Sequence, residues 1–224
     1  MDTIFFFLMT IFYLCLLLFS LGLAYRHGWL VTSNVLLLVI LALVYDNGIQ
    51  AFGKYIGEGD LLETLNEMRY WLHAFITPLL VLFAWDTVER VGVLWAKKPG
   101  YQLAIVFLTM ALIIVELMTE VWVLSLEPNW HMGVLTYDRV QESGEMPVMI
   151  MVVTVSLLIA SIIVGRLQTW FWYFIGVFIM TIGMLVDRPV ETGAYENFLE
   201  LILMTSLVAT KAFQDYHLSQ KENH

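Results

Sequence analysis

Three ionisable residues fall inside apolar stretches of the sequence, where a charged group is costly. His73 lies in RYWLHAFITPLLVL, and Glu116 and Glu120 lie in the apolar run near 101–124. The two glutamates are four residues apart, so on a helix they share one face. An imidazole and carboxylates that come together can act as general acid and base, or they can bind a metal ion. We therefore expect His73, Glu116 and Glu120 to be the catalytic residues if the protein is an enzyme.

The same residue types suggest a metal site. Imidazole and carboxylate ligands suit zinc or manganese and leave one coordination position for water. This chemistry predicts a divalent metal ion held by His73, Glu116, Glu120 and Asp46. A water molecule activated by that metal would hydrolyse a lipid ester, amide or phosphoester. The sequence contains no H-E-x-x-H or H-x-x-x-H motif, so the prediction requires side chains from several helices to converge.

Other polar residues flank the apolar runs at a similar depth, and we expect them to complete a pocket. They are Tyr45, Asp46, Asn47, Arg69, Asp187, Arg188, Glu196 and Glu200. An ionisable side chain in a bilayer costs about 2.5–3.5 kcal/mol on insertion scales, so such groups normally face the protein interior and have partners. A structural interpretation is also open. In it, Arg69 and Arg188 pair with carboxylates such as Asp46 and Glu116, and the ion pairs fix the helix register.

The elements that must position these residues are apolar helices. Mean hydropathy is +0.78, and 14% of the residues are charged, against roughly a quarter in soluble domains. Apolar runs of sufficient length to cross a bilayer fall near 3–25, 29–45, 69–85, 101–124, 147–165, 168–186 and 197–213. They predict an all-α fold, a seven-transmembrane-helix bundle in which residues 1–224 form a single polytopic membrane domain. Asp2 precedes the first run and Arg26 follows it, the reverse of the charge order in a signal peptide.

Charge predicts an orientation for this bundle. Seven Lys and Arg residues fall in alternate loops and the C-terminal tail, against four in the other loops. The positive-inside rule then places the N-terminus outside and the C-terminus in the cytoplasm. Fourteen of the 20 acidic residues fall on the predicted outer side, so the net charge of −9 is mainly an outward-facing field. Such a field attracts cations and repels anionic lipid and nucleic acid.

The segments that connect the apolar runs are expected to form turns, helix ends and loops. Residues 46–59 contain four glycines and are expected to form turns, and Asp60 with Glu63 has the form of a capping box that starts a helix near Leu61. Pro78 should kink the third span. The loop 125–147 either caps the polar residues or is a solvated connection, and its polarity favours the solvated connection.

One stretch of the third span carries a family resemblance. The segment RYWLHAFITPLLVL resembles the R-Y…T-P-L-L pattern of microbial rhodopsin third helices, with Arg69 and Pro78 nine residues apart as in that family. The resemblance implies a retinal-type photoreceptor with Lys211 as the Schiff-base lysine. Leu72 and Leu207 stand where the family has aspartates, and the resemblance covers only this one helix. Otherwise Lys211 is expected to extend its ammonium to the inner membrane interface as an anchor.

Two classes of function follow from these residues, and a structural partner protein is a third interpretation. The first is a lipid hydrolase, working with a metal or by acid–base catalysis. The second is a non-catalytic receptor, sensor or carrier for a cation or small polar solute, with the photoreceptor as a variant. In either case we expect a multi-pass protein of the cell membrane, with membrane lipid as a partner and no nucleic acid.

Overall fold

Helices run almost the whole length of the chain in the computed structural model, which describes residues 2–140, 148–186 and 193–222. Within these ranges the helices are α1 Asp2–His27, α2 Val35–Ile56, α3 Asp60–Ile76, α4 Leu79–Arg90, α5 Pro99–Glu116, α6 Val148–Gln168, α7 Trp172–Leu185 and α8 Ala194–Glu222. A 3-10 turn, η1 (Thr32–Asn34), precedes α2, and a π-helical turn, η2 (Leu117–Val121), follows α5. A two-stranded hairpin joins η2 to α6 through β1 (Leu126–His131) and β2 (Val134–Arg139).

The helices have the length and composition of membrane spans. Five helical segments in the described ranges are long and apolar enough to cross a bilayer: Asp2–His27, Thr32–Ile56, Asp60–Arg90, Pro99–Val121 and Val148–Gln168. The helix α7 is apolar but shorter. Large apolar side chains such as Leu18 and Phe107 are about two-thirds exposed, as expected for surfaces that face lipid rather than water. The prediction of an all-helical fold with membrane-compatible helices is therefore confirmed.

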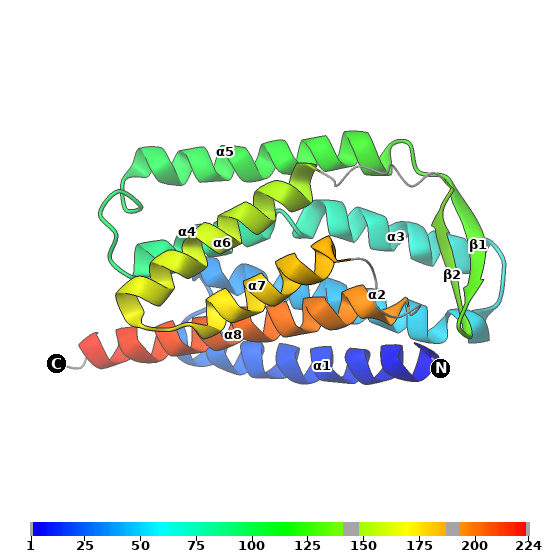
Figure 1. The fold of residues 1–224 in the computed structure, drawn as a ribbon, viewed down its shortest axis with the longest axis horizontal. Helices are drawn as coiled ribbons and strands as arrows, with labels where there is room; N and C mark the ends of the chain where they lie inside the picture. Colours follow the sequence, from blue (N-terminus) through cyan, green and yellow to red (C-terminus); the bar gives the residue numbers. More distant parts are fainter. Residues whose placement is uncertain (1, 141–147, 187–192, 223–224) are drawn as a thin grey trace.

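The helices pack side by side around a shared interior. Contacts run from α1 to α2, from α2 to α3 and α4, from α4 to α6, from α6 to α7, from α7 to α8, and from α8 back to α1. The helix α5 lies against α4 and α6. Figure 1 shows the N-terminus and the hairpin at one end of the bundle and the C-terminus at the other. We call these the hairpin end and the C-terminal end.

Pro78 breaks the third apolar run, as predicted. The helix α3 ends at Ile76 and α4 begins at Leu79, so the two form one interrupted rod. Proline has no N–H to continue the helical ladder, and its ring crowds the preceding turn. The Thr77 N–H still donates to the His73 carbonyl at 3.1 Å, which holds the end of α3 in place.

The glycine-rich segment differs from the prediction. Residues 46–56 continue α2, so Gly48 and Gly53 are helical rather than turn residues. Gly53 is instead a point of close approach, because a Cβ there would lie 2.0 Å from the backbone oxygen of Leu135 in β2. The turn is confined to Gly57 and Gly59, which have positive φ angles of 85° and 145°. The helix α3 begins at Asp60 with Gly59 as its cap, so the predicted capping box does not form.

The hairpin was not predicted, and it corrects the interpretation of loop 125–147 as a solvated connection. Met132 and Gly133 both have positive φ, the geometry of a two-residue type I′ hairpin turn. Residues 134–137 of β2 are buried, and Leu135 and Tyr137 form a small core with Leu62 of α3. The hairpin therefore packs onto the ends of α2 and α3, although residues 141–147 of the same loop lie outside the described part of the chain.

Candidate functional site

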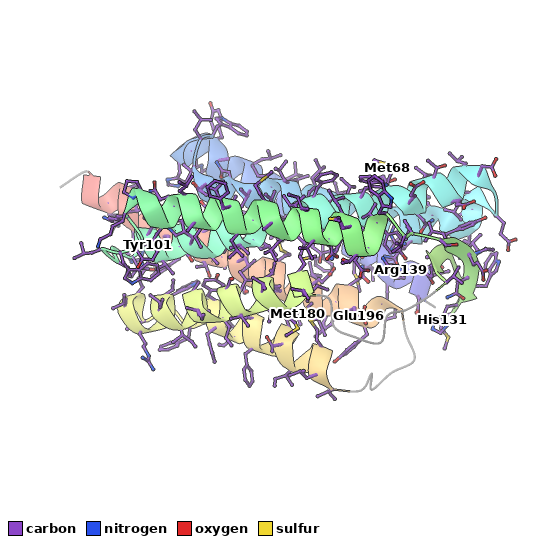
Figure 2. All side chains as sticks on the ribbon, turned by 90° about the horizontal axis from the view of Figure 1, so that it is seen from above. Met68, Tyr101, His131, Arg139, Met180 and Glu196 are labelled. Carbon is purple, nitrogen blue, oxygen red and sulfur yellow. The ribbon has the colours of Figure 1, made fainter. Side chains whose placement is uncertain are left out.

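A cavity of about 1130 Å³ lies between the helices at the hairpin end of the bundle. Its walls come from α2, α3, the end of α5 with η2, both strands of the hairpin, α6, α7 and α8. Figure 2 labels four of the lining residues, His131, Arg139, Met180 and Glu196, which belong to four different elements. A cavity of this volume is large enough for a small organic ligand.

The lining changes from polar to apolar along the bundle axis. On α8, Glu196, Asn197 and Glu200 line the cavity near the hairpin, and Leu203 and Met204 line it farther away. These five residues recur at helical spacing, so they form one stripe on the inner face of α8. The stripe on α3 makes the same transition, from Arg69 and His73 to Ile76. The cavity therefore has a charged end under the hairpin and an apolar end toward the middle of the bundle.

Asp46 is the centre of a hydrogen-bond network in the charged end. Its Oδ1 lies 2.7 Å from Arg69 Nε, and its Oδ2 accepts hydrogen bonds from Gln50 at 2.8 Å and from Asn197 at 3.0 Å. Arg69 also donates to the Asn66 side-chain oxygen at 2.7 Å. Both carboxylate oxygens of Asp46 are thus already paired, and the network joins α2, α3 and α8.

Glu120 is paired in a similar way with the hairpin. Arg139 of β2 donates from one terminal nitrogen to the Glu120 carboxylate and from the other to the Glu120 backbone oxygen at 2.8 Å. The Arg139 guanidinium also lies 5.7 Å from the centre of the Tyr70 ring. This pair connects the hairpin to η2 and neutralises one of the two glutamates of the fourth apolar run.

Glu116 and Glu200 differ from these paired carboxylates. Glu116 is only 4% exposed, lines the cavity, and makes no hydrogen bond or ion pair with any described residue. Glu200 is partly buried, lines the same cavity from α8, and likewise has no hydrogen bond or ion pair within the described ranges. Two carboxylates from different walls are therefore free to interact with a ligand.

His73 is exposed to the space inside the cavity. Its Nδ1 lies 3.2 Å from the Thr77 hydroxyl, one turn farther along the chain, and both side chains line the cavity. The other ring nitrogen makes no hydrogen bond within the part of the chain that the structure describes. The imidazole is thus positioned to accept or donate a proton to a molecule in the cavity.

The structure brings some of the site residues predicted from the sequence together in the cavity. Those that line the cavity are Asp46, Arg69, His73, Glu116, Glu120, Glu196 and Glu200. Tyr45 and Asn47 are not part of the lining: the Tyr45 hydroxyl donates to the Leu65 carbonyl at 2.9 Å, and the Asn47 amide donates to the Leu43 carbonyl at 2.9 Å. Asp187 and Arg188 lie outside the described residues.

Several lining residues were missed by sequence reasoning. These are Gln50, Asn129, His131, Asp138, Arg139 and Asn197. Gln50 and Asn197 could have been found from helical spacing, because Gln50 lies four residues after Asp46 and Asn197 three residues before Glu200. The hairpin residues carried no such signal, since nothing placed their loop over the cavity.

The structure does not support the predicted zinc or manganese site. Among the described residues, no three His, Cys, Asp or Glu side chains lie close enough together to hold a metal ion. The reason is the pairing described above. Asp46 is engaged by Arg69 and two amides, and Glu120 is engaged by Arg139, so two of the four expected ligands already have cationic partners. His73 and Glu116 remain, and two ligands are fewer than a structural or catalytic zinc site uses.

A second buried charge network lies at the C-terminal end and includes Lys211. Lys211 is 2% exposed and forms an ion pair with Asp215, so it does not extend to the interface as predicted. Asp215 also lies 2.6 Å from Arg90, and Arg90 lies 2.6 Å from Asp86. Lys211 is not a lining residue of the cavity at the hairpin end. The site therefore gives the retinal variant no support.

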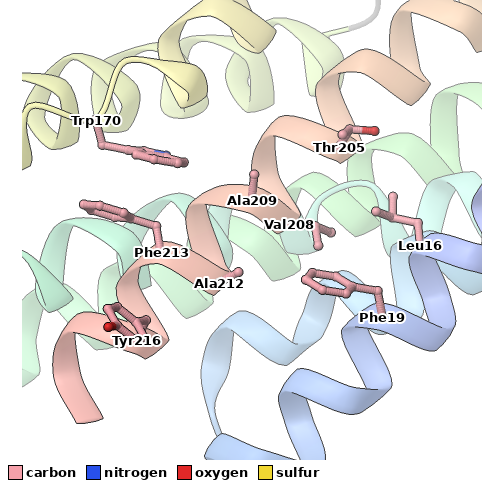
Figure 3. A pocket seen from close by; sticks show the side chains of 9 residues that line it. All are labelled: Leu16, Phe19, Trp170, Thr205, Val208, Ala209, Ala212, Phe213 and Tyr216. Atoms are coloured by element: carbon pink, nitrogen blue, oxygen red, sulfur yellow. The ribbon is translucent and has the colours of Figure 1, made fainter. Parts of the chain in front are cut away.

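A smaller apolar groove of about 470 Å³ lies on the outside of the bundle between α1 and α8 (Figure 3). Leu16 and Phe19 approach it from α1, and Val208 and Phe213 from α8. Trp170 stacks on Phe213 with ring centroids 4.2 Å apart. None of the lining side chains is charged, so the groove lacks the charged groups that distinguish the internal cavity.

The internal cavity is thus the site that could do chemistry, because it contains two unpaired carboxylates, the imidazoles of His73 and His131, two arginine–carboxylate pairs and an apolar extension. It can bind an amphipathic molecule, and it can exchange protons with one. Comparison with protein families, with curated proteins and with solved structures found no match for this chain.

Proposed function

We propose that the chain is an integral membrane protein that binds a small amphipathic ligand in its internal cavity, as a receptor, sensor or carrier without catalysis. The observation that supports this most directly is the division of one large cavity into a charged end and an apolar end. Ligand sites are typically concave and mostly apolar, with a few polar groups that fix orientation. The cavity has these properties, and its two arginine–carboxylate pairs are held in place by hydrogen bonds.

The proposal includes seven membrane crossings. The helix α7 and the longer α8 then join the five segments that are apolar enough to span. The location of the N-terminus and C-terminus at opposite ends of the bundle supports an odd number of crossings. With the N-terminus outside the cell, the hairpin and the charged end of the cavity lie at the outer surface of the cell membrane, where a ligand arrives from the medium or from the outer leaflet.

Binding without chemistry is favoured because the strongest charges in the cavity are already neutralised. Asp46 and Glu120 serve as partners of Arg69 and Arg139, which is the structural role of an ion pair between helices. The described lining offers no activated serine or cysteine nucleophile beside a base. A site with fixed ion pairs and two free carboxylates orients a ligand more readily than it attacks one.

Acid–base hydrolysis of a lipid is the second candidate, and one contact favours it. His73 and Thr77 lie within 3.2 Å of each other and both face the cavity, so the imidazole can take a proton from the hydroxyl or from a water molecule. In this alternative Glu116 is the carboxylic acid and His73 the base. Glu120 then serves only as the partner of Arg139, and Asp46 as the partner of Arg69.

A thermal-shift experiment tests the binding function. The purified full-length protein and two single variants, a matched pair on α6, are each heated with decylamine, decanol or decanoate. Val153 is buried and lines the cavity, whereas Val155 is 53% exposed on the outside of the bundle. We expect at least one amphiphile to raise the Tm of the wild type and of Val155→Phe but not that of Val153→Phe, because the added ring occupies the cavity.

Equal shifts in both variants, or no shift in the wild type, would refute a ligand in this cavity. The hydrolase alternative is tested by adding monodecanoylglycerol and measuring released decanoate. Sustained release that is lost in His73→Ala would favour the enzyme over the binding protein.

A further inference from the structure

We infer that the ligand of the internal cavity carries a cationic, ammonium-type head group, which Glu116 and Glu200 receive. This inference rests on the proposed binding function and specifies the chemistry of the ligand. It depends on which charges in the cavity are already compensated within the protein and which are not.

The acidic residues of the cavity fall into two groups. Asp46 and Glu120 each face an arginine, and Asp138 accepts hydrogen bonds from Asn129 and Thr136. Glu116 and Glu200 have neither kind of partner among the described residues. Thus Asp46, Glu120 and Asp138 have an arginine or hydrogen-bond donors as partners, whereas Glu116 and Glu200 have neither among the described residues.

Glu116 is the stronger indication of the two. It is 4% exposed, so its carboxylate has lost most of its contact with water. A buried charged group without a partner is costly, and a cation that enters the cavity would offset that cost. Arg139 is near enough for its charge to act on Glu116, but its hydrogen bonds go to Glu120. The arginine therefore leaves the Glu116 oxygens available.

The backbone next to Glu116 also departs from a regular helix. The helix α5 ends at Glu116, and η2 continues it with a π-helical turn in which the Trp122 N–H donates to the Leu117 carbonyl at 2.9 Å. Such turns insert an extra residue and occur frequently at functional sites. Here the π-helical turn begins directly after Glu116 and contains Glu120. Glu116 is free in the cavity, whereas Glu120 is paired with Arg139 of the hairpin.

Glu200 approaches from the opposite side of the ring of helices, on α8. Besides the Arg69–Asp46 ion pair, the charge near Glu200 is that of Glu196, one turn earlier on α8. An anionic head group would meet a like charge beside either glutamate, and a neutral one would bring no counter-charge. An ammonium group, with several N–H donors, is complementary to each of these carboxylates.

The remainder of the ligand is expected to be apolar. Beyond Glu200 the cavity is lined by Leu203 and Met204 of α8, with Leu157 and Met180 facing it from α6 and α7. Methionine side chains adapt to chains of different shape. A long-chain amine or an aminolipid would place its ammonium in the charged end of the cavity and its hydrocarbon along these residues.

Three probes of equal chain length distinguish the ligand classes: decylamine, decanol and decanoate. Their Kd values are measured on the full-length protein in nanodiscs of neutral lipid, for the wild type, Glu116→Gln, Glu200→Gln and Glu63→Gln. Glu63 is exposed and is not a lining residue, so its variant loses the same charge outside the cavity. Gln preserves side-chain volume, and an unchanged Tm without ligand shows that each variant is folded.

We expect decylamine to bind the wild type most tightly, and each cavity variant to weaken decylamine by about tenfold or more, as for loss of a charge-assisted hydrogen bond. Decanol affinity should stay within about twofold, and Glu63→Gln should match the wild type.

Two results would overturn the inference while leaving the binding function intact. One is decanol or decanoate binding as tightly as decylamine. The other is unchanged decylamine affinity in Glu116→Gln and Glu200→Gln, which would mean that these residues are protonated and structural. Binding of none of the three probes would refute the proposed function itself, and this inference with it.

Discussion

Arg69 Nε lies 2.7 Å from Asp46 Oδ1, and this ion pair joins α3 to α2 at the charged end of the cavity. Neither side chain is fully buried, with 15% of Arg69 and 23% of Asp46 exposed. Gln50 and Asn197 donate to the second oxygen of Asp46, so the pair is the centre of a network rather than an isolated contact. Its loss should therefore affect three helices.

Asp46→Asn is expected to destabilise the protein by about 1–3 kcal/mol, between the values for exposed and buried ion pairs. The substitution keeps the volume of the side chain but leaves Arg69 without its counter-charge. Denaturant unfolding in detergent measures the change. In the double variant Asp46→Asn/Arg69→Gln no charge is left unpaired, so it should be more stable than Asp46→Asn alone. A double variant less stable than both single ones would contradict this explanation.

Gly53→Ala is expected to displace the hairpin. The new Cβ would lie 2.0 Å from the Leu135 backbone oxygen, and neither backbone can move without disturbing the small core of Leu62, Leu135 and Tyr137. Hydrogen exchange of residues 126–139 should become faster. Gly48→Ala is the matched control, because its nearest neighbour is a methyl of Thr10 at 4.0 Å. That variant should be neutral or more stable by about 0.5–1 kcal/mol, since alanine favours a helix. Equal effects of the two substitutions would show that the close approach is unimportant.

The helices themselves could be predicted from the sequence because apolar runs of span length have few other structures available. The break at Pro78 followed from the chemistry of proline. Individual positions within helices were also predictable: His73, Glu116 and Glu200 line the cavity because each lies on an inward-facing stripe.

Pairing between elements was harder to predict. Arg139 lies 19 residues after Glu120, across a hairpin whose only local signal is the Met132-Gly133 turn in a strand-rich stretch. Gly53 was misread because a glycine in a close approach and a glycine in a turn look the same in a sequence. The metal prediction lacks support for the same reason. Spacing placed Asp46 and Glu120 near His73, but it did not show that arginines already occupied both carboxylates.

The packing of α7 against α8 should depend on Gly176 more than on Gly183. A Cβ on Gly176 would lie 2.4 Å from Ser206 Cβ, which is fixed to the backbone of α8. A Cβ on Gly183 would meet the tip of Leu199 at 2.3 Å, and a leucine can change rotamer. We expect Gly176→Ala to cost about 1–3 kcal/mol and Gly183→Ala less, as measured by Tm. The reverse order would contradict this packing.

Removing Asp215 should be more damaging than removing Lys211. Asp215 is 4% exposed and is the shared partner of Arg90 and Lys211, so Asp215→Asn leaves the buried Lys211 without a counter-charge and Arg90 with Asp86 alone. Breaking a buried pair in this way typically costs about 3–5 kcal/mol. Lys211→Met instead puts an apolar chain of similar length in a buried position, and Asp215 keeps Arg90 at 2.6 Å. Unfolding of both variants in detergent tests the order, and a larger loss for Lys211→Met would show that the lysine has a role beyond this network.

The proposed orientation can be tested with cysteines placed at the two ends of the bundle. The native Cys15 is first replaced by alanine. Glu58 is exposed next to the hairpin, and its hydrogen bond to Trp130 is a surface contact, whereas Lys97 is exposed in the connection between α4 and α5. With the N-terminus outside, Glu58→Cys should react with a membrane-impermeant maleimide in intact cells, and Lys97→Cys should react only after permeabilisation. The opposite pattern would invert the bundle and place the charged end of the cavity in the cytoplasm. Reaction at both sites in intact cells would refute the spanning arrangement, because these residues lie at opposite ends of helices that must cross the bilayer between them.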